Sequence, residues 1–450
     1  MKSQLLKFAI TSEVHLNNGS QGWLMDEQWP EGWPGELVLE GRTHFHLPTN
    51  LSEGEANRAG PGVKGERAVF HNHAMSGNRT RTVLVMAHEM NEGILNGDKP
   101  VRMLDSLAAS GIRSHRICHE LPSEMVSRLQ LWMCDMDENA ISWLEANYKH
   151  NPAAEIGEFK PVCGDARQVA LSRGWQWVDI DPFGSPIPFL DSVMQSLARK
   201  AVLEVTATDV AALTGSSPAP LMRRYGARAR LDEIAHDTGL RILLASVARC
   251  AARHDKVIEP LISTWDSHHL RVSVRVRKSL DSASIVEQNL GWRIANPSDI
   301  EAGENAGHGH ILVPLDTVVD KTDKRISGPL WTGQIGDAEV MASMTEERAL
   351  ELCGPTEKIC DDESELRLRR RAIARSVRHL AGESLAIHSG NLVVVDSLAS
   401  RLQLPAPPSP TKLAEALVAM GHCAAVAAYG KPAIRTDAPW DSILSALKSV

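Results

Sequence analysis

Between positions 101 and 209 the chain repeats one pattern: a short apolar segment, an aspartate at its end, and a stretch with the spacing of a helix. Strands that alternate with helices predict an α/β fold around a parallel, doubly wound sheet. Ligands of such sheets bind beyond the carboxyl ends of the strands. Five aspartates are expected at that edge, namely Asp105, Asp135, Asp165, Asp181 and Asp209. One aspartate there is an ordinary turn residue, but five on successive strands indicate a binding edge.

The apolar segments predict strands near 101–104, 129–135, 160–165, 175–181 and 201–209. The helical spacing predicts helices at 110–121, 138–151 and 190–200. Residues 138–151 are the clearest example, because Ile141, Leu144 and Tyr148 share one side. Residues 1–60 show little periodicity and are expected to form loops and short strands.

Residues 178–186, VDIDPFGSP, form the most constrained turn of this pattern, because two prolines and a glycine fix the backbone path. An exocyclic amine of a nucleobase is a poor nucleophile, since its lone pair is delocalised into the ring. Asp181 and the carbonyl group of Pro182 can accept its hydrogens, and Phe183 can stack on the base, which contributes about 1–3 kcal/mol. The turn resembles the Asp/Asn-Pro-Pro-Phe/Tyr turn of amino methyltransferases. The alternative is a proline-rich loop with an aromatic plug.

The first two strand ends predict a nucleoside cofactor. The turn DSLAASG supplies Asp105 and Gly111, and the glycine lets the backbone approach a ligand. Asp135 is placed to hold the two hydroxyls of a ribose, and Asp165 can accept a hydrogen bond from an adenine amine. A ribose and an adenine without a G-x-G-x-x-G phosphate loop favour S-adenosylmethionine over NAD. For each acid the alternative is an aspartate that ends a strand or caps a helix.

Composition limits the other classes of function. The chain has 450 residues and a net charge of −8, whereas proteins that bind polyanions are usually basic overall, so the net charge does not indicate a polyanionic partner. Seven scattered cysteines without a C-x-x-C pair predict reduced thiols in a cytoplasmic protein, no cysteine zinc site and no structural metal. No apolar stretch is long enough to span a membrane, and a monomer is expected.

Two segments concentrate positive charge despite the acidic balance. Arg223, Arg224, Arg228 and Arg230 fall within eight residues, and the segment LRLRRRAIARSVR at 366–378 contains six arginines. One interpretation of the second segment is a solvated helix face paired with the acids at 361–365. The other is a surface that contacts phosphates.

The C-terminal part has a different organisation. Residues 299–310 are polar and glycine-rich, which is typical of a loop near a boundary. Helices are expected at 396–404 and 411–421, separated by PAPPSP, and a hairpin at 422–436. This order predicts a winged-helix-like module. We expect a catalytic domain at 1–277 and a C-terminal α+β domain at 278–450.

Several motifs resemble one known family, the tRNA (guanine-26-N2)-dimethyltransferases of archaea and eukaryotes. They include EGRTHFHLP (40–48), VFHNHAMSGNRT (69–80), LDSLAASGIRSHR (104–116), DIDPFGSPIPFLD (179–191), SGPLWTGQIGD (327–337), LQLPAPPSP (402–410) and IRTDAP (434–439). The resemblance covers nearly the whole chain. It implies a class I S-adenosylmethionine-dependent methyltransferase with a Rossmann-like sheet, which dimethylates the N2 amine of guanosine 26 in tRNA.

The resemblance also implies roles for single residues. Asp181 matches the family's catalytic acid, and Phe70 and Phe183 match the aromatics that enclose the flipped guanine. The positions that match the cofactor-binding residues are Arg79, Arg113, Asp135, Asp165 and Ala166. Because anionic RNA must be held, the arginines at 367–378 become a predicted phosphate surface in a tRNA-binding C-terminal domain.

The chain departs from the family where it reads Phe70-His71-Asn72-His73-Ala74-Met75, since the family commonly reads Phe-Tyr-Asn-Pro-Arg-Met. The paired cysteines that many members carry in the C-terminal half are also absent between Cys250 and Cys353. Three alternatives stay open at this point. They are methylation of another guanine such as position 10, a non-catalytic RNA-binding relative, and a dehydrogenase, which the missing phosphate loop disfavours.

Overall fold

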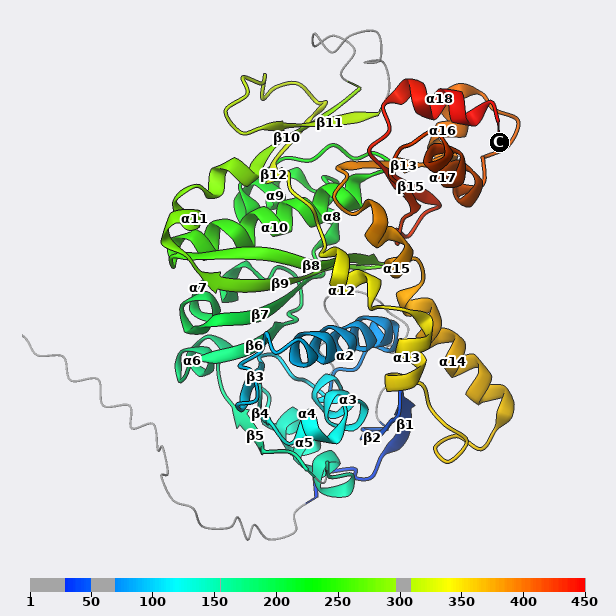
Figure 1. Ribbon diagram of the computed structural model, residues 1–450. Coiled ribbons are helices and arrows are strands. Elements are labelled where there is room, and N and C mark those ends of the chain that lie inside the picture. Colours follow the sequence, from blue (N-terminus) through cyan, green and yellow to red (C-terminus); the bar gives the residue numbers. More distant parts are fainter. Residues whose placement is uncertain (1–28, 50–68, 154, 297–308, 450) are drawn as a thin grey trace, which may run out of the picture.

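The computed structural model describes residues 29–49, 69–153, 155–296 and 309–449. A large sheet lies at the centre of the molecule, and helices surround it (Figure 1). Within these ranges no helix is long and apolar enough to cross a membrane. Residues 299–308 of the predicted glycine-rich loop and most of residues 1–60 lie outside the described residues, and His310 at the end of that loop begins a strand.

A seven-stranded sheet with the order β5-β4-β3-β6-β7-β9-β8 forms the centre of the chain. The first five strands in sequence are parallel, and β9 runs antiparallel between β7 and β8. The bounds are β3 (Val101–Asp105), β4 (Leu129–Asp135), β5 (Glu158–Cys163), β6 (Trp175–Ile180), β7 (Leu197–Ala207), β8 (Lys256–Asp266) and β9 (His269–Lys278). The doubly wound sheet predicted from the alternating pattern is therefore confirmed.

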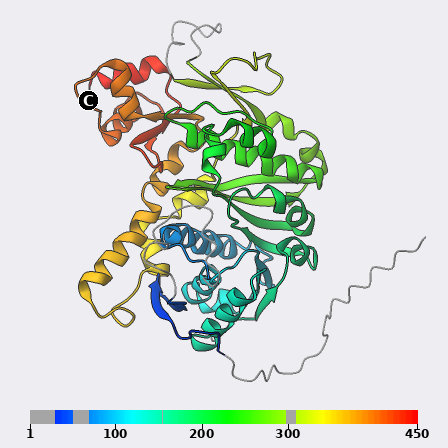
Figure 2. The ribbon, with the colours of Figure 1, turned by 180° about the vertical axis from the view of Figure 1, so that it is seen from behind.

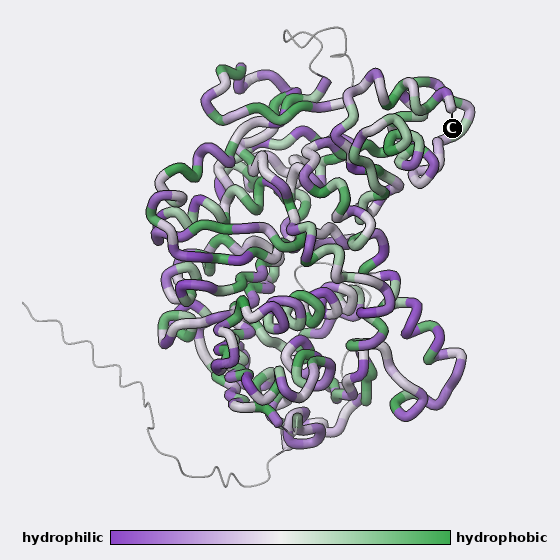
Figure 3. Tube along the Cα trace, in the orientation of Figure 1, coloured by the Kyte–Doolittle hydropathy of each residue, from purple (hydrophilic) through white to green (hydrophobic). Residues whose placement is uncertain are grey.

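The central strands are buried on both faces, as a parallel sheet covered by helices requires. Every residue of β6 is buried, and Figure 3 shows hydrophobic segments in green through the middle of the molecule, with hydrophilic segments in purple among them. Three buried charged residues of these strands, Asp179, Glu204 and Arg271, are described below.

Helices cover both faces because the strand order reverses after β5. Right-handed crossovers place α3 (Ile112–Glu120) and α5 (Glu138–His150) on one face. They place α6 (Ala166–Leu171), α7 (Ile187–Ser196) and α10 (Ala235–Arg253) on the other. The point of reversal lies between β3 and β6, which is where ligands of such sheets bind.

The helix predicted at 190–200 was wrong at its end. Helix α7 stops at Ser196, and Leu197 already begins β7. The reason is pairing on both sides, because Leu197 pairs with Trp175 on β6 and Lys200 pairs with Arg277 on β9. Ladder hydrogen bonds of the sheet outweigh the local helical preference of these residues.

Helix α2 (Ser76–Asn91) connects the two halves of the chain. Its polar side chains reach the sheet, where Thr82 donates a hydrogen bond to Glu204 on β7 at 2.8 Å. Its other side packs against α13 (Glu346–Cys353) and α14 (Glu363–Val377), and α14 lies beside α2 in both Figure 1 and Figure 2. Most residues of α2 are buried as a result.

A hairpin of β1 (Glu36–Glu40) and β2 (Thr43–Leu47) packs on α3 and α5. The short 3-10 helix η1 (His73–Met75) leads into α2. Smaller helices complete this half of the chain; they are α4 (Ser123–Val126), α8 (Val210–Leu213), α9 (Pro218–Tyr225) and α11 (Leu280–Ser284).

The C-terminal part contains two three-stranded sheets. The first joins β11 (His310–Pro314), β10 (Leu290–Ala295) and β12 (Ile326–Trp331), and α12 (Ala338–Ala342) follows it. The second joins β13 (Asn391–Val394), β15 (Ala433–Thr436) and β14 (Ala424–Val426). Helices α15 (Leu380–Glu383), α16 (Val395–Leu402), α17 (Pro410–Ala419) and α18 (Trp440–Leu447) surround the second sheet.

The helix, helix and hairpin order predicted for the C-terminal module is confirmed by α16, α17 and the β14–β15 pair. This module has a small buried cluster of its own, formed by residues of 395–446. The main buried cluster nevertheless extends from Val83 to Ile387 and so passes position 277. The division into domains at 277 and 278 stays a prediction.

Candidate active site

The five predicted aspartates lie at one edge of the sheet. Asp105 and Asp135 are the last residues of β3 and β4, and Asp165, Asp181 and Asp209 follow β5, β6 and β7. All five strands are parallel, so these ends point the same way. The expectation of an acidic edge is therefore confirmed in its topology.

Asp181 is held in place by an arginine of helix α3. Arg113, in the first turn of α3, donates from Nη2 to Oδ2 of Asp181 at 2.5 Å. The guanidinium is fixed by two further bonds from Nη1, to Asn78 Oδ1 at 2.8 Å and to Thr82 Oγ1 at 3.0 Å. Oδ1 of Asp181 has no hydrogen-bond partner among the described residues and is free to accept one.

The turn after Asp181 is pinned to the end of β7. The backbone N–H of Gly184 donates to Thr208 Oγ1 at 2.6 Å, and the N–H of Thr208 donates to the Gly184 carbonyl at 3.0 Å. Gly184 has φ +86°, a left-handed conformation that favours glycine. Ser185 Oγ donates to Tyr225 Oη at 2.9 Å, and that hydroxyl donates to Asp209 at 2.7 Å. The prolines and the glycine thus fix a backbone path, as predicted.

Phe70 and Phe183 lie against each other although they are 113 positions apart in the sequence. Their ring centroids are 4.4 Å apart, and the ring planes meet at 79°. Both rings stay accessible, with exposed fractions of 42% for Phe70 and 63% for Phe183. The edge-to-face contact leaves no space for a base between the rings, so enclosure of a base requires them to separate. The predicted enclosure of guanine stays a prediction.

The turn after β3 is closed by Asp135. Its Oδ2 accepts the N–H of Ala109 at 2.8 Å, and its Oδ1 accepts the N–H of Asp137 at 3.0 Å. Each carboxylate oxygen keeps a further lone pair, and the residue is half-buried. Gly111 begins α3 with φ +72°, and a Cβ atom there would lie 2.7 Å from Leu144, so the close packing of α3 on α5 needs glycine.

Asp105 lies deeper than its predicted role requires. It is almost fully buried and accepts a hydrogen bond from Ser114 Oγ at 2.8 Å. Burial, together with the charge of Asp179, its partner across the β3–β6 ladder, raises the pKa of Asp105 to about 7. Asp105 is therefore a buried residue below the surface of this edge.

Two other predicted cofactor residues are engaged elsewhere. Asp165 is the N-cap of α6, where it accepts the N–H of Arg167 at 2.8 Å and pairs with the Arg167 guanidinium at 2.5 Å, while Ala166 is the buried first residue of that helix. The helix-cap alternative is thus present for this acid. Arg79 pairs through both guanidinium ends with Glu40 at 2.5 Å. Its predicted contact with the cofactor, like that of Asp165, stays a prediction.

A buried group of charges beneath Asp181 was missed by sequence reasoning. Arg271 on β9 is paired with both Asp179 on β6 and Glu204 on β7, and it also donates to Thr206 Oγ1 at 2.5 Å. Asp179 and Glu204 are fully buried. The signal was present for Glu204, because this residue interrupts the apolar segment of β7. Removal of one member would leave buried charges unpaired.

The arginines of 366–378 divide between the two interpretations. Arg367 pairs with Glu363 at 2.8 Å, and Arg369 pairs with Glu365, both within the same helix. These pairs agree with the solvated-face interpretation. Arg371 and Arg375 are exposed, and neither has an ion pair or side-chain hydrogen bond within the described part of the chain. Of the other basic segment, Arg224 pairs with Asp209 at 2.9 Å, which places α9 beside the turn of Phe183.

Comparisons with known proteins agree with this geometry. A family profile described as N2,N2-dimethylguanosine tRNA methyltransferase matches residues 48–448. A tRNA (guanine(26)-N(2))-dimethyltransferase of Methanosphaerula palustris is 31% identical over 415 residues, which cover 92% of this chain and 98% of that protein. The protein of the same name from Pyrococcus furiosus is 29% identical over 417 residues, or 88% of this chain and 98% of its own length.

A solved structure shows the same fold. Trm1 from Pyrococcus horikoshii, in complex with S-adenosyl-L-methionine, superposes with a TM-score of 0.71 over 91% of this chain and 99% of its own, at 24% identity. The fold prediction of a class I methyltransferase with a C-terminal part is confirmed by this match. With a profile match that spans most of its length, the chain belongs to the N2,N2-dimethylguanosine tRNA methyltransferase family.

Proposed function

We propose that this chain transfers methyl groups from S-adenosylmethionine to the exocyclic N2 amine of guanosine 26 in tRNA, twice in succession. The observation that carries the proposal is the turn after β6, which presents a free carboxylate oxygen of Asp181 next to the exposed ring of Phe183. Family membership and the names of the relatives support the substrate. They favour position 26 over position 10 and an enzyme over a non-catalytic relative.

The donor set at the sheet edge fits the proposed cofactor. Asp135 keeps one lone pair on each carboxylate oxygen, which suits the two hydroxyls of a ribose. When bound, S-adenosylmethionine supplies an electrophilic methyl group on a positively charged sulfur. The acidic edge between β3 and β6 carries the opposite charge, and no phosphate loop is needed for such a ligand. Asp165 and Ala166 would border its adenine, and Arg79 and Arg113 its amino-acid part.

Asp181 would hold the amine and receive its proton. Its free Oδ1 accepts one N–H of the base, and the carbonyl of Pro182 accepts the other, which localises the nitrogen lone pair for attack. A new N–C bond forms as the bond from sulfur to the methyl carbon breaks, and the proton lost from nitrogen passes by way of Asp181 to solvent. Arg113 keeps the carboxylate in this orientation. One N–H remains after the first transfer, so the same groups serve the second.

Phe70 and Phe183 would replace the stacking that the guanine loses when it leaves the tRNA. Flipping a base costs a few kcal/mol, and stacking on aromatic side chains returns about 1–3 kcal/mol per base. The two rings already occupy neighbouring positions at 4.4 Å. They exchange their mutual contact for contact with the two faces of the base.

We also propose that the exposed arginines of α14 contact tRNA phosphates, since α14 packs directly against α2, the helix that follows Phe70. One chain carries all of the groups named here, which supports a monomer. The seven cysteines all lie in described ranges and are free thiols, which supports a cytoplasmic location.

The test is mass analysis of nucleosides from tRNA that has been incubated with the protein and labelled S-adenosylmethionine. We expect N2,N2-dimethylguanosine at position 26, with the monomethyl nucleoside as an early product. A transcript with adenosine at position 26 should stay unlabelled, because adenine has no amine on that ring carbon. A product confined to position 10, or full labelling of the adenosine transcript, would contradict the proposal.

A further inference from the structure

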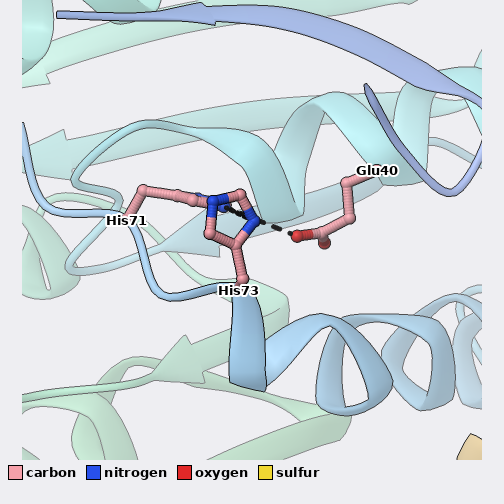
Figure 4. Close-up of side chains that lie close together, drawn as sticks. All are labelled: Glu40, His71 and His73. Atoms are coloured by element: carbon pink, nitrogen blue, oxygen red, sulfur yellow. Dashed lines mark hydrogen bonds and ion pairs between the residues drawn. The ribbon is translucent and has the colours of Figure 1, made fainter. Parts of the chain in front are cut away.

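Three potential metal ligands converge beside the candidate active site. They are Glu40 at the end of β1, His71, which lies two residues before η1, and His73, the first residue of η1. Figure 4 shows their side chains directed toward one another. His71 Nε2 lies 3.7 Å from Glu40 Oε2 and 3.3 Å from His73 Nδ1. One ligand atom from each residue lies within 4.8 Å of the other two.

The lone pairs of these atoms are available. Glu40 Oε1 accepts from Arg79 Nε and Arg116 Nη1, whereas Oε2 accepts only from Arg79 Nη2. Oε2 therefore keeps a lone pair, and it is the oxygen that faces His71.

The side chain of His71 is 1% exposed. Its second ring nitrogen, Nδ1, is buried and has no hydrogen-bond partner among the described residues. The ring is thus oriented by packing against Phe45, with centroids 5.0 Å apart, and by what Nε2 contacts.

The separations suit a tetrahedral ion. Zinc binds histidine nitrogen and carboxylate oxygen at about 2.0–2.2 Å, so two ligand atoms of a tetrahedral site lie roughly 3.3–3.6 Å apart. The observed 3.3 Å and 3.7 Å fall close to that range. We propose that Glu40, His71 and His73 form a binding site for a divalent transition metal, with zinc as the preferred ion. Water completes the set on the side where His73 is exposed.

Two arginines near the site do not preclude a cation. Arg116 is balanced by Glu120, with Nη2 and Oε2 at 2.8 Å, and Arg79 is balanced by Glu40 itself. The expectation of no metal came from the spacing of cysteines, and this group contains no cysteine. The competing explanation is a metal-free hydrogen bond between the two histidines, which the experiment below separates from metal binding.

An ion here would tie β1 to the turn that carries Phe70. Residue 70 directly precedes His71, so coordination of His71 and His73 restricts the backbone next to the ring proposed to stack on guanine. This consequence rests on the proposed function, whereas the metal site itself does not.

The test is a titration of the full-length, chelator-treated protein with Co²⁺, which gives visible absorption in tetrahedral sites. We expect one equivalent to bind, zinc to displace it, and the protein to melt at a higher temperature with metal. His73→Ala should abolish this signal, and His73→Asn provides a second variant that keeps a polar side chain in the turn. His88→Ala, on α2 and outside every group of potential ligands, should leave it unchanged.

The spectrum also separates this site from the two other groups of potential ligands among the described residues, because both contain a cysteine. They are Asp191 with Cys250 and His254, and His388 with Cys423 and Asp437. Cobalt bound to a thiolate adds a strong near-ultraviolet band that a site of nitrogen and oxygen ligands lacks. Absence of visible absorption at a tenfold excess of Co²⁺, presence of the thiolate band, or an unchanged signal in both His73 variants would each overturn the proposal.

Discussion

Replacing Asp181 by asparagine tests the catalytic proposal, because the surrounding bonds dictate how the amide must sit. Arg113 Nη2 donates to Oδ2 of Asp181, and Arg113 is itself fixed by Asn78 and Thr82. In Asp181→Asn only the amide oxygen can accept that bond. The amide NH2 group must then occupy the position of Oδ1. The free acceptor becomes a donor that opposes the donor N–H of the substrate amine.

The expected loss follows from that exchange. A positioned acceptor of a proton contributes typically about 10²–10⁴ in rate. Because the variant replaces attraction by opposition, we expect the upper part of the range, about 10³–10⁴, or roughly 4–5.5 kcal/mol of the activation barrier. The melting temperature and the affinity for S-adenosylmethionine should change little, since the bond to Arg113 is kept.

Single-turnover transfer of labelled methyl groups to a tRNA transcript measures the chemical step, and calorimetry measures cofactor affinity. Asp181→Ala is the matched control, because it removes the carboxylate without adding a donor and leaves room for water to accept the hydrogen bond. We expect the asparagine variant to be no faster than the alanine variant despite its closer shape. An asparagine variant within tenfold of the unaltered protein would refute the reasoning.

Three further outcomes are expected. Phe183→Ala should lower kcat/KM for tRNA about 5- to 150-fold, because one face of the base loses its stacking partner. The affinity for the cofactor, measured by calorimetry, should stay unchanged. An equal loss in kcat/KM and in cofactor affinity would argue against a role in stacking. The raised pKa of Asp105, about 7, means that its ionisation opposes folding as the pH rises from about 4 to 7. Asp105→Asn should therefore raise the melting temperature more at pH 8 than at pH 5, because only part of the penalty has developed at pH 5; a gain independent of pH would contradict this. Replacing Arg371 and Arg375 by glutamate should weaken tRNA binding and reduce the slope of log affinity against log salt concentration by about 1 per lost phosphate contact. Arg253→Glu, an exposed control on α10, should have neither effect. Equal effects of the two changes would favour the solvated-face interpretation.

Much of the sheet edge could be predicted because it depends on local order along the chain. Apolar segments of strand length ending in aspartate, with helices between them, place Asp135 and Asp181 at the same edge of a parallel sheet without any knowledge of contacts. The glycine and prolines of 182–186 fixed a turn for the same local reason. The end of α7 was misplaced because the pairing of Leu197 with β6 and of Lys200 with β9 is a long-range effect.

The parts that escaped prediction depend on residues distant in sequence. Arg271 and Asp179 are 92 positions apart, and nothing in a single sequence says that they pair. Glu204 interrupts an apolar strand, which signals a buried polar partner but not which one. The orientation of Arg113 toward Asp181 has the same origin, since the resemblance implied only a cofactor contact. The closed arrangement of Phe70 and Phe183 depends on side-chain packing that a motif does not encode.

The enclosure of α2 has a consequence for how this enzyme can change over evolutionary time. Helices α13 and α14 belong to the same buried cluster as the apolar residues of α2, and Arg81 on α2 donates to the Ser376 carbonyl on α14 at 2.7 Å. Exchange of everything after position 277 for an unrelated RNA-binding module would strip one side of α2 bare. This chain can therefore acquire new tRNA preferences through substitutions on exposed surfaces such as that of α14. Recombination that replaces the whole part after position 277 would instead disrupt the packing of α2.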